Sequence, residues 1–184
     1  MKLWLLRHAA VALGAGLCYG ASDVPAQAAL NRQAAQTAAA VLPPGLPLRT
    51  SALERTRQLG AALRALRPDL GAAVVDARLN EFNFGQWELQ PWDAIPRLAF
   101  DAWMADFAHH RFGGVESTQA LIDRVAQVLR DAREQGMPEA VWITHAGVIR
   151  AVQYLAQHGE GADCLGGAVA REAPAPGGYI QITL

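Results

Sequence analysis

Short apolar runs alternate along the chain with longer segments in which apolar residues recur every three or four positions. Residues 3–6 (LWLL), 72–76 (AAVVD) and 140–144 (AVWIT) are short runs of the first kind, and residues 46–50 and 179–184 are shorter versions of the same pattern. A brief, uninterrupted apolar run is typical of a strand buried on both faces of a parallel sheet. The pattern therefore predicts a strand at each of these places.

Helical spacing of apolar residues fills the segments between these strands. It predicts helices over residues 26–41, from Ser51 to Pro68, from Leu121 towards Gly136, and after Gly147. At the second of these helices, Ser51 and Glu54 fit a capping box, in which two side chains bond the free backbone N–H groups of the helix start. Strands that alternate with helices form a sheet covered on both faces. We therefore expect an α/β fold, a three-layer α/β/α sandwich with a mostly parallel central sheet.

Residues 84–114 interrupt this alternation. The segment contains three of the five tryptophans, two prolines and the pair Gly113-Gly114, with no sustained period. Turn-forming residues at this density mark irregular structure. We interpret the segment as an irregular, lid-like insertion near the active site, with one or two short helices, in a single domain that spans residues 1–184.

Charge and cysteine content limit which classes of binding partner and which cellular compartment we expect for this protein. The chain has 16 Lys+Arg against 17 Asp+Glu, with no basic cluster, so nothing favours a nucleic-acid backbone or an anionic membrane as partner. Lys2 is the only lysine, and arginine suits fixed contacts with carboxylate or phosphate groups. Cys18 and Cys164 lack the spacing of a disulfide scaffold, and no apolar run approaches the roughly 18 residues of a membrane helix. We expect a cytoplasmic protein.

Two histidines follow predicted strands directly. Arg7-His8 comes after the first strand, and His145 comes after the run at 140–144. Ligands bind at the carboxyl ends of the strands in such sheets, so we expect both histidines at one site. His109-His110 are adjacent and would point apart, and no carboxylate pattern surrounds them. We predict no metal site.

Four short motifs occur in order through most of the chain. They are L-R-H-A at 6–9, S-A-L-E-R-T at 51–56, L-N-E with G-Q-W-E between 79 and 88, and T-H-A-G-V-I-R at 144–150. Together they resemble the histidine phosphatase superfamily, also called the phosphoglycerate mutase-like family. The resemblance implies a phosphomonoesterase that works through a phosphohistidine, without a metal or another cofactor, on a small-molecule phosphate ester.

The resemblance also implies roles for individual residues. The catalytic set would be His8, Glu81, Arg7, Arg55 and His145. His8 would be the nucleophile, which needs a neutral imidazole held by a hydrogen bond at its other nitrogen. The cationic and histidine side chains would bind the phosphoryl oxygens. Glu81 would be the general acid, and Glu88 lies near enough in sequence to be an alternative.

A narrower resemblance lies in the loop at residues 16–25, G-L-C-Y-G-A-S-D-V-P. It is similar to the corresponding loop of bacterial α-ribazole phosphatases. The implied substrate is α-ribazole 5'-phosphate or adenosylcobalamin 5'-phosphate in cobalamin biosynthesis, with Tyr19 as a substrate-binding residue. The alternative interpretation is a turn that packs beside the first strand, with Cys18 buried.

Two positions depart from the family pattern. Ala9 and Ala146 stand where the superfamily usually has glycine after each histidine, and each methyl group could crowd the phosphate pocket. Two other functions stay open: hydrolysis of a different small ester, such as a sugar phosphate or phosphoglycerate, and non-catalytic binding of a phosphate ligand. The sequence leaves the oligomeric state open, with a homodimer as one possibility.

Overall fold

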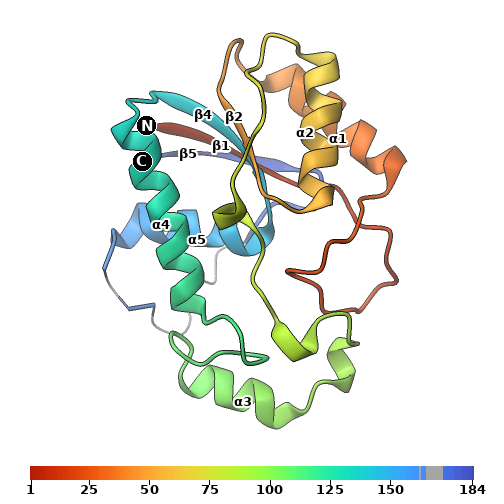
Figure 1. The fold of residues 1–184 in the computed structure, drawn as a ribbon, viewed down its shortest axis with the longest axis vertical. Helices are drawn as coiled ribbons and strands as arrows, with labels where there is room; N and C mark the ends of the chain where they lie inside the picture. The colour runs from red at the N-terminus through yellow and green to blue at the C-terminus, as the bar shows by residue number, and fades with distance from the viewer. Residues whose placement is uncertain (162, 165–171) are drawn as a thin grey trace.

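A central five-stranded sheet organises the protein (Figure 1). The computed structural model describes residues 1–161, 163–164 and 172–184. The strands are β1 (Lys2–Arg7), β2 (Leu48–Thr50), β3 (Val74–Val75), β4 (Glu139–Thr144) and β5 (Tyr179–Thr183), in the order β3-β2-β4-β1-β5. Among these described strands, β5 alone is antiparallel to its neighbour β1, whereas the β1–β4, β4–β2 and β2–β3 pairs are parallel. The predicted mostly parallel sheet is confirmed.

Helices cover both faces of this sheet. They are α1 (Ala28–Val41), α2 (Glu54–Leu66), α4 (Thr118–Glu134) and α5 (Ala146–His158), with α3 (Arg97–Ala105) away from the sheet. Alternate residues of β1 face the two layers, because successive side chains of a strand point to opposite faces. Leu3 and Leu5 join the core cluster formed by α4 and α5, and Trp4 and Leu6 join the cluster formed by α1 and α2. The predicted three layers are confirmed.

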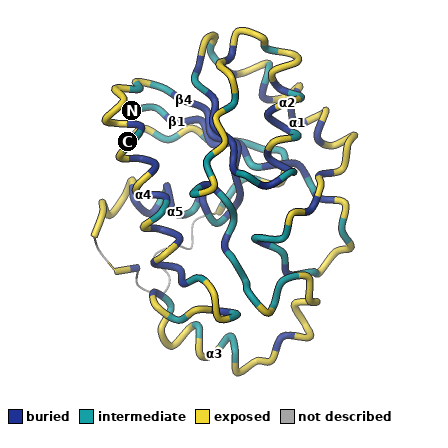
Figure 2. Tube along the Cα trace, viewed as in Figure 1, coloured by how far each residue is buried: buried dark blue, intermediate teal, exposed yellow. Residues whose placement is uncertain are grey.

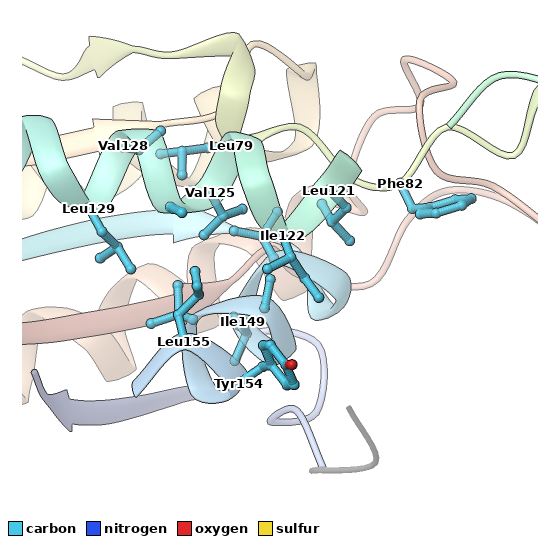
Figure 3. Packing of buried hydrophobic residues seen from close by; sticks show 14 of the residues in the cluster. Leu79, Phe82, Leu121, Ile122, Val125, Val128, Leu129, Ile149, Tyr154 and Leu155 are labelled. Atoms are coloured by element: carbon cyan, nitrogen blue, oxygen red, sulfur yellow. The ribbon is translucent and has the colours of Figure 1, made fainter. Parts of the chain in front are cut away.

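The α4 and α5 layer holds the larger of the two core clusters. Figure 3 shows Val125 and Leu129 of α4 opposite Ile149 and Leu155 of α5. Each large aliphatic side chain buried in this way contributes about 1.5–3 kcal/mol. In Figure 2 the deeply buried part of the chain follows the central strands, while the insertion is a mixture of exposed, intermediate and a few buried residues. The carboxyl ends of β1, β2 and β4 are therefore held by a well-packed sheet.

The start of α2 differs from the predicted capping box. The helix begins at Glu54, and its N-cap residue Leu53 makes no side-chain cap. Instead, the Glu54 amide donates a hydrogen bond of 2.5 Å to the carboxylate of Asp23, which lies in the loop after β1. The capping-box prediction was wrong because Ser51 is used elsewhere, and a carboxylate distant in sequence occupies the favourable N-terminal end of the helix.

The predicted strand at 72–76 is reduced to Val74–Val75. Both residues are 54% exposed at the edge of the sheet, beside β2 alone. With one neighbour and few buried side chains, little holds a longer strand in place there. The apolar run was therefore a good indicator of where a strand lies and a poor indicator of its length.

The segment 84–114 contains α3 and the short 3-10 helices η2 (Gly85–Trp87) and η3 (Trp92–Ala94). It is bonded through its backbone to the loop after β1: the Leu89 amide donates to the Cys18 carbonyl at 2.7 Å, and the Cys18 amide donates to the Gln90 carbonyl at 2.8 Å. Within it, the Trp103 and Phe112 rings stack at 4.5 Å. The two backbone hydrogen bonds join the insertion to the loop that carries Tyr19, and the stacked rings pack the insertion internally.

Within the described ranges, no helix is both long enough and apolar enough to cross a membrane.

Candidate active site

His8 stands directly after β1 and is buried, with 2% of its surface exposed. Its Nδ1 atom lies 2.7 Å from the carbonyl oxygen of Ala9. A carbonyl can only accept, so Nδ1 carries the proton and Nε2 keeps a free lone pair. Burial, followed by the charge of Arg55, lowers the pKa of His8 to about 3. The imidazole is therefore neutral at physiological pH.

His145 lies beside His8, with the two ring centroids 5.0 Å apart. It follows β4, stands at the N-cap of α5 and is fully buried. The Nε–H of Arg55 donates to its Nδ1 at 3.3 Å, and its Nε2 lies 2.8 Å from the hydroxyl oxygen of Ser51. Because Nδ1 accepts, Nε2 carries the proton and donates to Ser51. Burial holds the pKa of His145 well below its usual range, which keeps this tautomer neutral.

Ser51 and Thr56 complete a buried hydroxyl chain behind His145. The two hydroxyl oxygens are 2.8 Å apart, and the Thr56 hydroxyl donates a hydrogen bond to the Leu53 carbonyl at 2.8 Å. The Ser51 hydroxyl therefore donates to Thr56 and accepts from His145, which fixes the histidine tautomer. Neither role was predicted from the sequence, because Ser51 was assigned to a helix cap, although both residues belong to the S-A-L-E-R-T motif.

We expect Ser51→Ala to lower kcat/KM on phosphate esters by about tenfold, because losing one hydrogen bond on His145 is worth about 1–1.5 kcal/mol. Steady-state kinetics measures this effect. Ser117→Ala, which removes the side-chain cap of α4, is the matched control. It should lower stability by about 1 kcal/mol and leave kcat/KM unchanged. Unchanged kcat/KM in Ser51→Ala would contradict a role for the hydroxyl chain.

Arg55 is a fully buried guanidinium on the first turn of α2. It donates to the carbonyls of Gly20 at 2.6 Å and Ser22 at 2.8 Å, and its central carbon lies 5.5 Å from the centre of the Tyr19 ring. A planar guanidinium suits both a fork of hydrogen bonds and stacking on an aromatic face. Arg55 thus connects the loop after β1 to His145, with Tyr19 as its aromatic cover.

Arg7 presents a donor that the described residues leave unused. Its Nη1 donates to the Pro174 carbonyl at 3.0 Å, while its Nε atom is buried without a hydrogen-bond partner among the described residues. A buried donor left in this state costs about 1–3 kcal/mol. An anionic oxygen bound at this edge of the sheet would satisfy it.

Glu81 approaches the same site from the segment after β3. Both of its carboxylate oxygens accept from the Gly147 amide at 3.1 Å, at the positive end of α5. A Cβ atom on Gly147 would overlap this carboxylate, so the approach requires glycine. Burial lowers the pKa of both Arg7 and Arg55, and the negative charge of Glu81 offsets part of this effect by raising the pKa of each. The carboxylate therefore lies in the electrostatic field of both arginines.

Glu88 has a different position. Its carboxylate accepts from the amides of residues 20–22 and Phe84 and from the Ser22 hydroxyl at 2.5–3.1 Å. Burial would raise the pKa of Glu88, yet these hydrogen bonds outweigh it and lower the pKa. A carboxylate so occupied holds the loop as an anion, and the geometry favours Glu81 over Glu88 as a proton donor.

We expect Glu88→Gln to lower the free energy of unfolding by about 2 kcal/mol, because an amide cannot accept all of these charge-assisted bonds. Since the folded pKa is lowered, this stabilisation is present above the ordinary pKa of about 4.3 and is lost as the pH falls through the lower folded value. Urea unfolding should show a constant gap to the native protein from pH 8 to 5 that narrows in more acidic solution. Glu134→Gln, at the exposed end of α4, is the control. A gap of similar size at every pH would contradict the anionic role.

The two alanines that depart from the family pattern are buried in the protein. Ala9 is 1% exposed and belongs to the cluster of α1 and α2, and Ala146 is 7% exposed at the start of α5. Ala9 also supplies the carbonyl that orients His8. The structure thus brings His8, His145, Arg55, Glu81 and Tyr19 together through the contacts above, with Arg7 next to His8 at the end of β1.

Comparison with known proteins shows the family to which the chain belongs. A sequence model of the Histidine phosphatase superfamily (branch 1) matches residues 3–164. No curated protein matches the chain. The solved structure of the protein TTHB049 from Thermus thermophilus is 27% identical, with a TM-score of 0.73, and the match covers 99% of this chain and 93% of that chain.

Two neighbours with a stated activity share the fold. The mycobacterial glucosyl-3-phosphoglycerate phosphatase is 23% identical, with a TM-score of 0.81, over 99% of this chain and 92% of that chain. The α-ribazole phosphatase from Shigella flexneri is 23% identical, with a TM-score of 0.80, over 100% of this chain and 91% of that chain. With its fold, its paired histidines and the match over most of its length, the chain belongs to the histidine phosphatase superfamily (branch 1) and is a phosphoric monoester hydrolase.

Proposed function

We propose that this protein hydrolyses a small phosphate monoester through a phosphohistidine formed on Nε2 of His8. The observation that carries the proposal is the 2.7 Å hydrogen bond from Nδ1 of His8 to the Ala9 carbonyl. It leaves the lone pair on Nε2, and the lowered pKa keeps the ring neutral without a separate base.

The reaction has two steps. Nε2 of His8 attacks phosphorus as the bond to the ester oxygen breaks, and Glu81 gives its proton to that oxygen. Glu81 then takes a proton from the water that attacks the phosphohistidine, which releases inorganic phosphate and restores both groups. Arg7 and Arg55 bind the equatorial oxygens, where the transition-state charge develops. His145, whose Nδ1 accepts from Arg55 and whose Nε2 donates to Ser51, holds Arg55 in place and has no N–H left for an oxygen of the substrate. The unused Nε of Arg7 and the contact from Arg55 to His145 support this arrangement.

For the substrate we propose α-ribazole 5'-phosphate or adenosylcobalamin 5'-phosphate, in cobalamin biosynthesis. The loop motif at 16–25 and the Tyr19 ring over Arg55 support this choice. An aromatic wall beside a phosphate site suits an ester with a planar base, which can stack on it. The shared fold of the Shigella flexneri α-ribazole phosphatase is consistent with this substrate, and the mycobacterial neighbour makes a sugar phosphate or phosphoglycerate ester the alternative.

A substrate panel tests the choice. It should contain α-ribazole 5'-phosphate, adenosylcobalamin 5'-phosphate, glucosyl-3-phosphoglycerate and 3-phosphoglycerate, with phosphate release as the readout. We expect the highest kcat/KM on one of the first two esters, and Tyr19→Ala should reduce that preference. A higher value on either glycerate ester would overturn the proposed substrate. Binding of all four esters without turnover would overturn the enzyme itself in favour of a phosphate-ligand binding protein.

We also expect turnover without a divalent metal, because Arg7 and Arg55 supply the donors that the transition state needs. Incubation with EDTA should change kcat by less than about twofold. Loss of activity that one specific metal restores would show that the phosphate pocket has been misinterpreted.

Several further properties stay predictions. They are the single domain over residues 1–184 with a lid-like insertion at 84–114, the cytoplasmic location, and the lack of a nucleic-acid or membrane partner. The oligomeric state stays open, with a homodimer as one possibility.

A further inference from the structure

The segment that carries Glu81 is bonded to the side chain of Arg124. This arginine lies within α4, and its Nη1 donates to the carbonyls of Arg78 at 2.6 Å and Asn80 at 2.7 Å. Its Nη2 donates to the carbonyl of Glu81 itself at 3.1 Å. The guanidinium therefore fixes three backbone oxygens around the position of the proposed acid.

Glu116 holds the same guanidinium from the other side. The Nε of Arg124 donates to one oxygen of Glu116 at 2.7 Å, and Nη2 donates to the other at 3.2 Å. The second oxygen also accepts from the amide of Asn83 at 2.9 Å. The ion pair is largely shielded, with side-chain exposures of 18% for Arg124 and 14% for Glu116. The pair thus bonds the chain on both sides of Glu81.

This arrangement matters because Glu81 lies outside any regular helix or strand. Its segment follows the 3-10 helix η1 (Ala77–Leu79), so neither a helix nor a sheet ladder fixes its backbone. A general acid must lie about 2.6–3.2 Å from the oxygen that it protonates. A displacement of about 1 Å can cost about 10²-fold in rate. Charge-assisted bonds from a forked guanidinium are strong enough to set such a position.

We propose that Arg124 and Glu116 are a pair of positioning residues that hold Glu81 in place for proton transfer to the leaving group. Neither side chain is assigned a contact with substrate. This inference rests on the proposed function, in which Glu81 is the acid.

The test compares two esters in Arg124→Met and Glu116→Gln. One is the alkyl phosphate that the panel above shows to be turned over fastest, and the other is p-nitrophenyl phosphate, whose leaving group needs no proton. We expect kcat to fall at least about tenfold more on the alkyl ester than on p-nitrophenyl phosphate. In a Glu81→Gln background this extra loss should disappear, because both changes act through one carboxylate.

Arg130→Met is the matched control, because Arg130 lies on the same helix and pairs with Glu160. It should leave the ratio of the two kcat values unchanged. Thermal unfolding identifies any variant that fails to fold, and Glu116→Gln, which keeps the shape of the side chain, then decides the question. Arg124→Lys adds a third variant, since a lysine cannot reproduce the fork.

The two possible failures are distinguishable. Equal losses on both esters in Arg124→Met and Glu116→Gln, with a selective loss in Glu81→Gln, would overturn the positioning role and leave the acid role standing. Equal losses in Glu81→Gln would overturn the acid role itself, and the positioning role with it.

Discussion

Replacing His8 by alanine should reduce turnover by at least about 10⁴-fold on every phosphate ester, because removal of a nucleophile eliminates the covalent route. No other described side chain at the site combines a buried neutral imidazole with a lone pair left free by its hydrogen bonding. The measurement is phosphate release under single-turnover conditions, which detects very slow hydrolysis.

Inorganic phosphate binding is the control for this variant. Arg7 and Arg55 remain in His8→Ala, so isothermal titration should still detect phosphate. Activity within about tenfold of the native protein, together with native phosphate binding, would contradict the nucleophilic role. The pH profile adds a second check. With the pKa of His8 lowered to about 3, its protonation should not limit kcat/KM between pH 5 and 8 in the native protein.

Glu81→Gln should slow hydrolysis of α-ribazole 5'-phosphate by roughly 10² or more and slow p-nitrophenyl phosphate hydrolysis much less. A ribose 5'-hydroxyl leaves as a strongly basic alkoxide unless it is protonated, whereas p-nitrophenolate is stable as an anion. Steady-state kcat on the two esters measures the difference. A folding defect would lower both rates together, so the ratio isolates the proton transfer.

Glu88→Gln is the matched control, because its carboxylate accepts bonds from the loop after β1. Its ratio of rates on the two esters should stay at the native value. If Glu88→Gln gave the selective loss and Glu81→Gln did not, the acid role would pass to Glu88.

The layered fold could be predicted because a strand that is buried on both faces has an uninterrupted run of apolar residues in the sequence. Leu3 to Leu6 form one apolar run because alternate residues face different helix layers. The polar residues that end this run and the run of β4 then lie at one edge of the sheet. Their position identified His8 and His145, and the motif pattern added Arg55 and Glu81.

The supporting contacts were not predictable, because they join residues far apart in the chain. The bond between Ser51 and His145 spans 94 positions, and the cap that Asp23 provides for α2 spans 31. Arg124 occurs on a helix that carries several other charged residues, and nothing in its own segment indicates that it binds the backbone at Glu81. The local periodicity of apolar residues predicts which side chains are buried, and it does not predict contacts between residues far apart in the chain.

The most direct test of the central claim is to trap the intermediate. The native protein and His8→Ala should be mixed briefly with ³²P-labelled substrate and quenched in alkali, where phosphohistidine survives, and the labelled peptide should be identified by mass spectrometry. The account predicts label on the peptide that contains His8, lost on acid treatment and absent from His8→Ala. Label on a serine, a cysteine or His145, or equal label in His8→Ala, would contradict it.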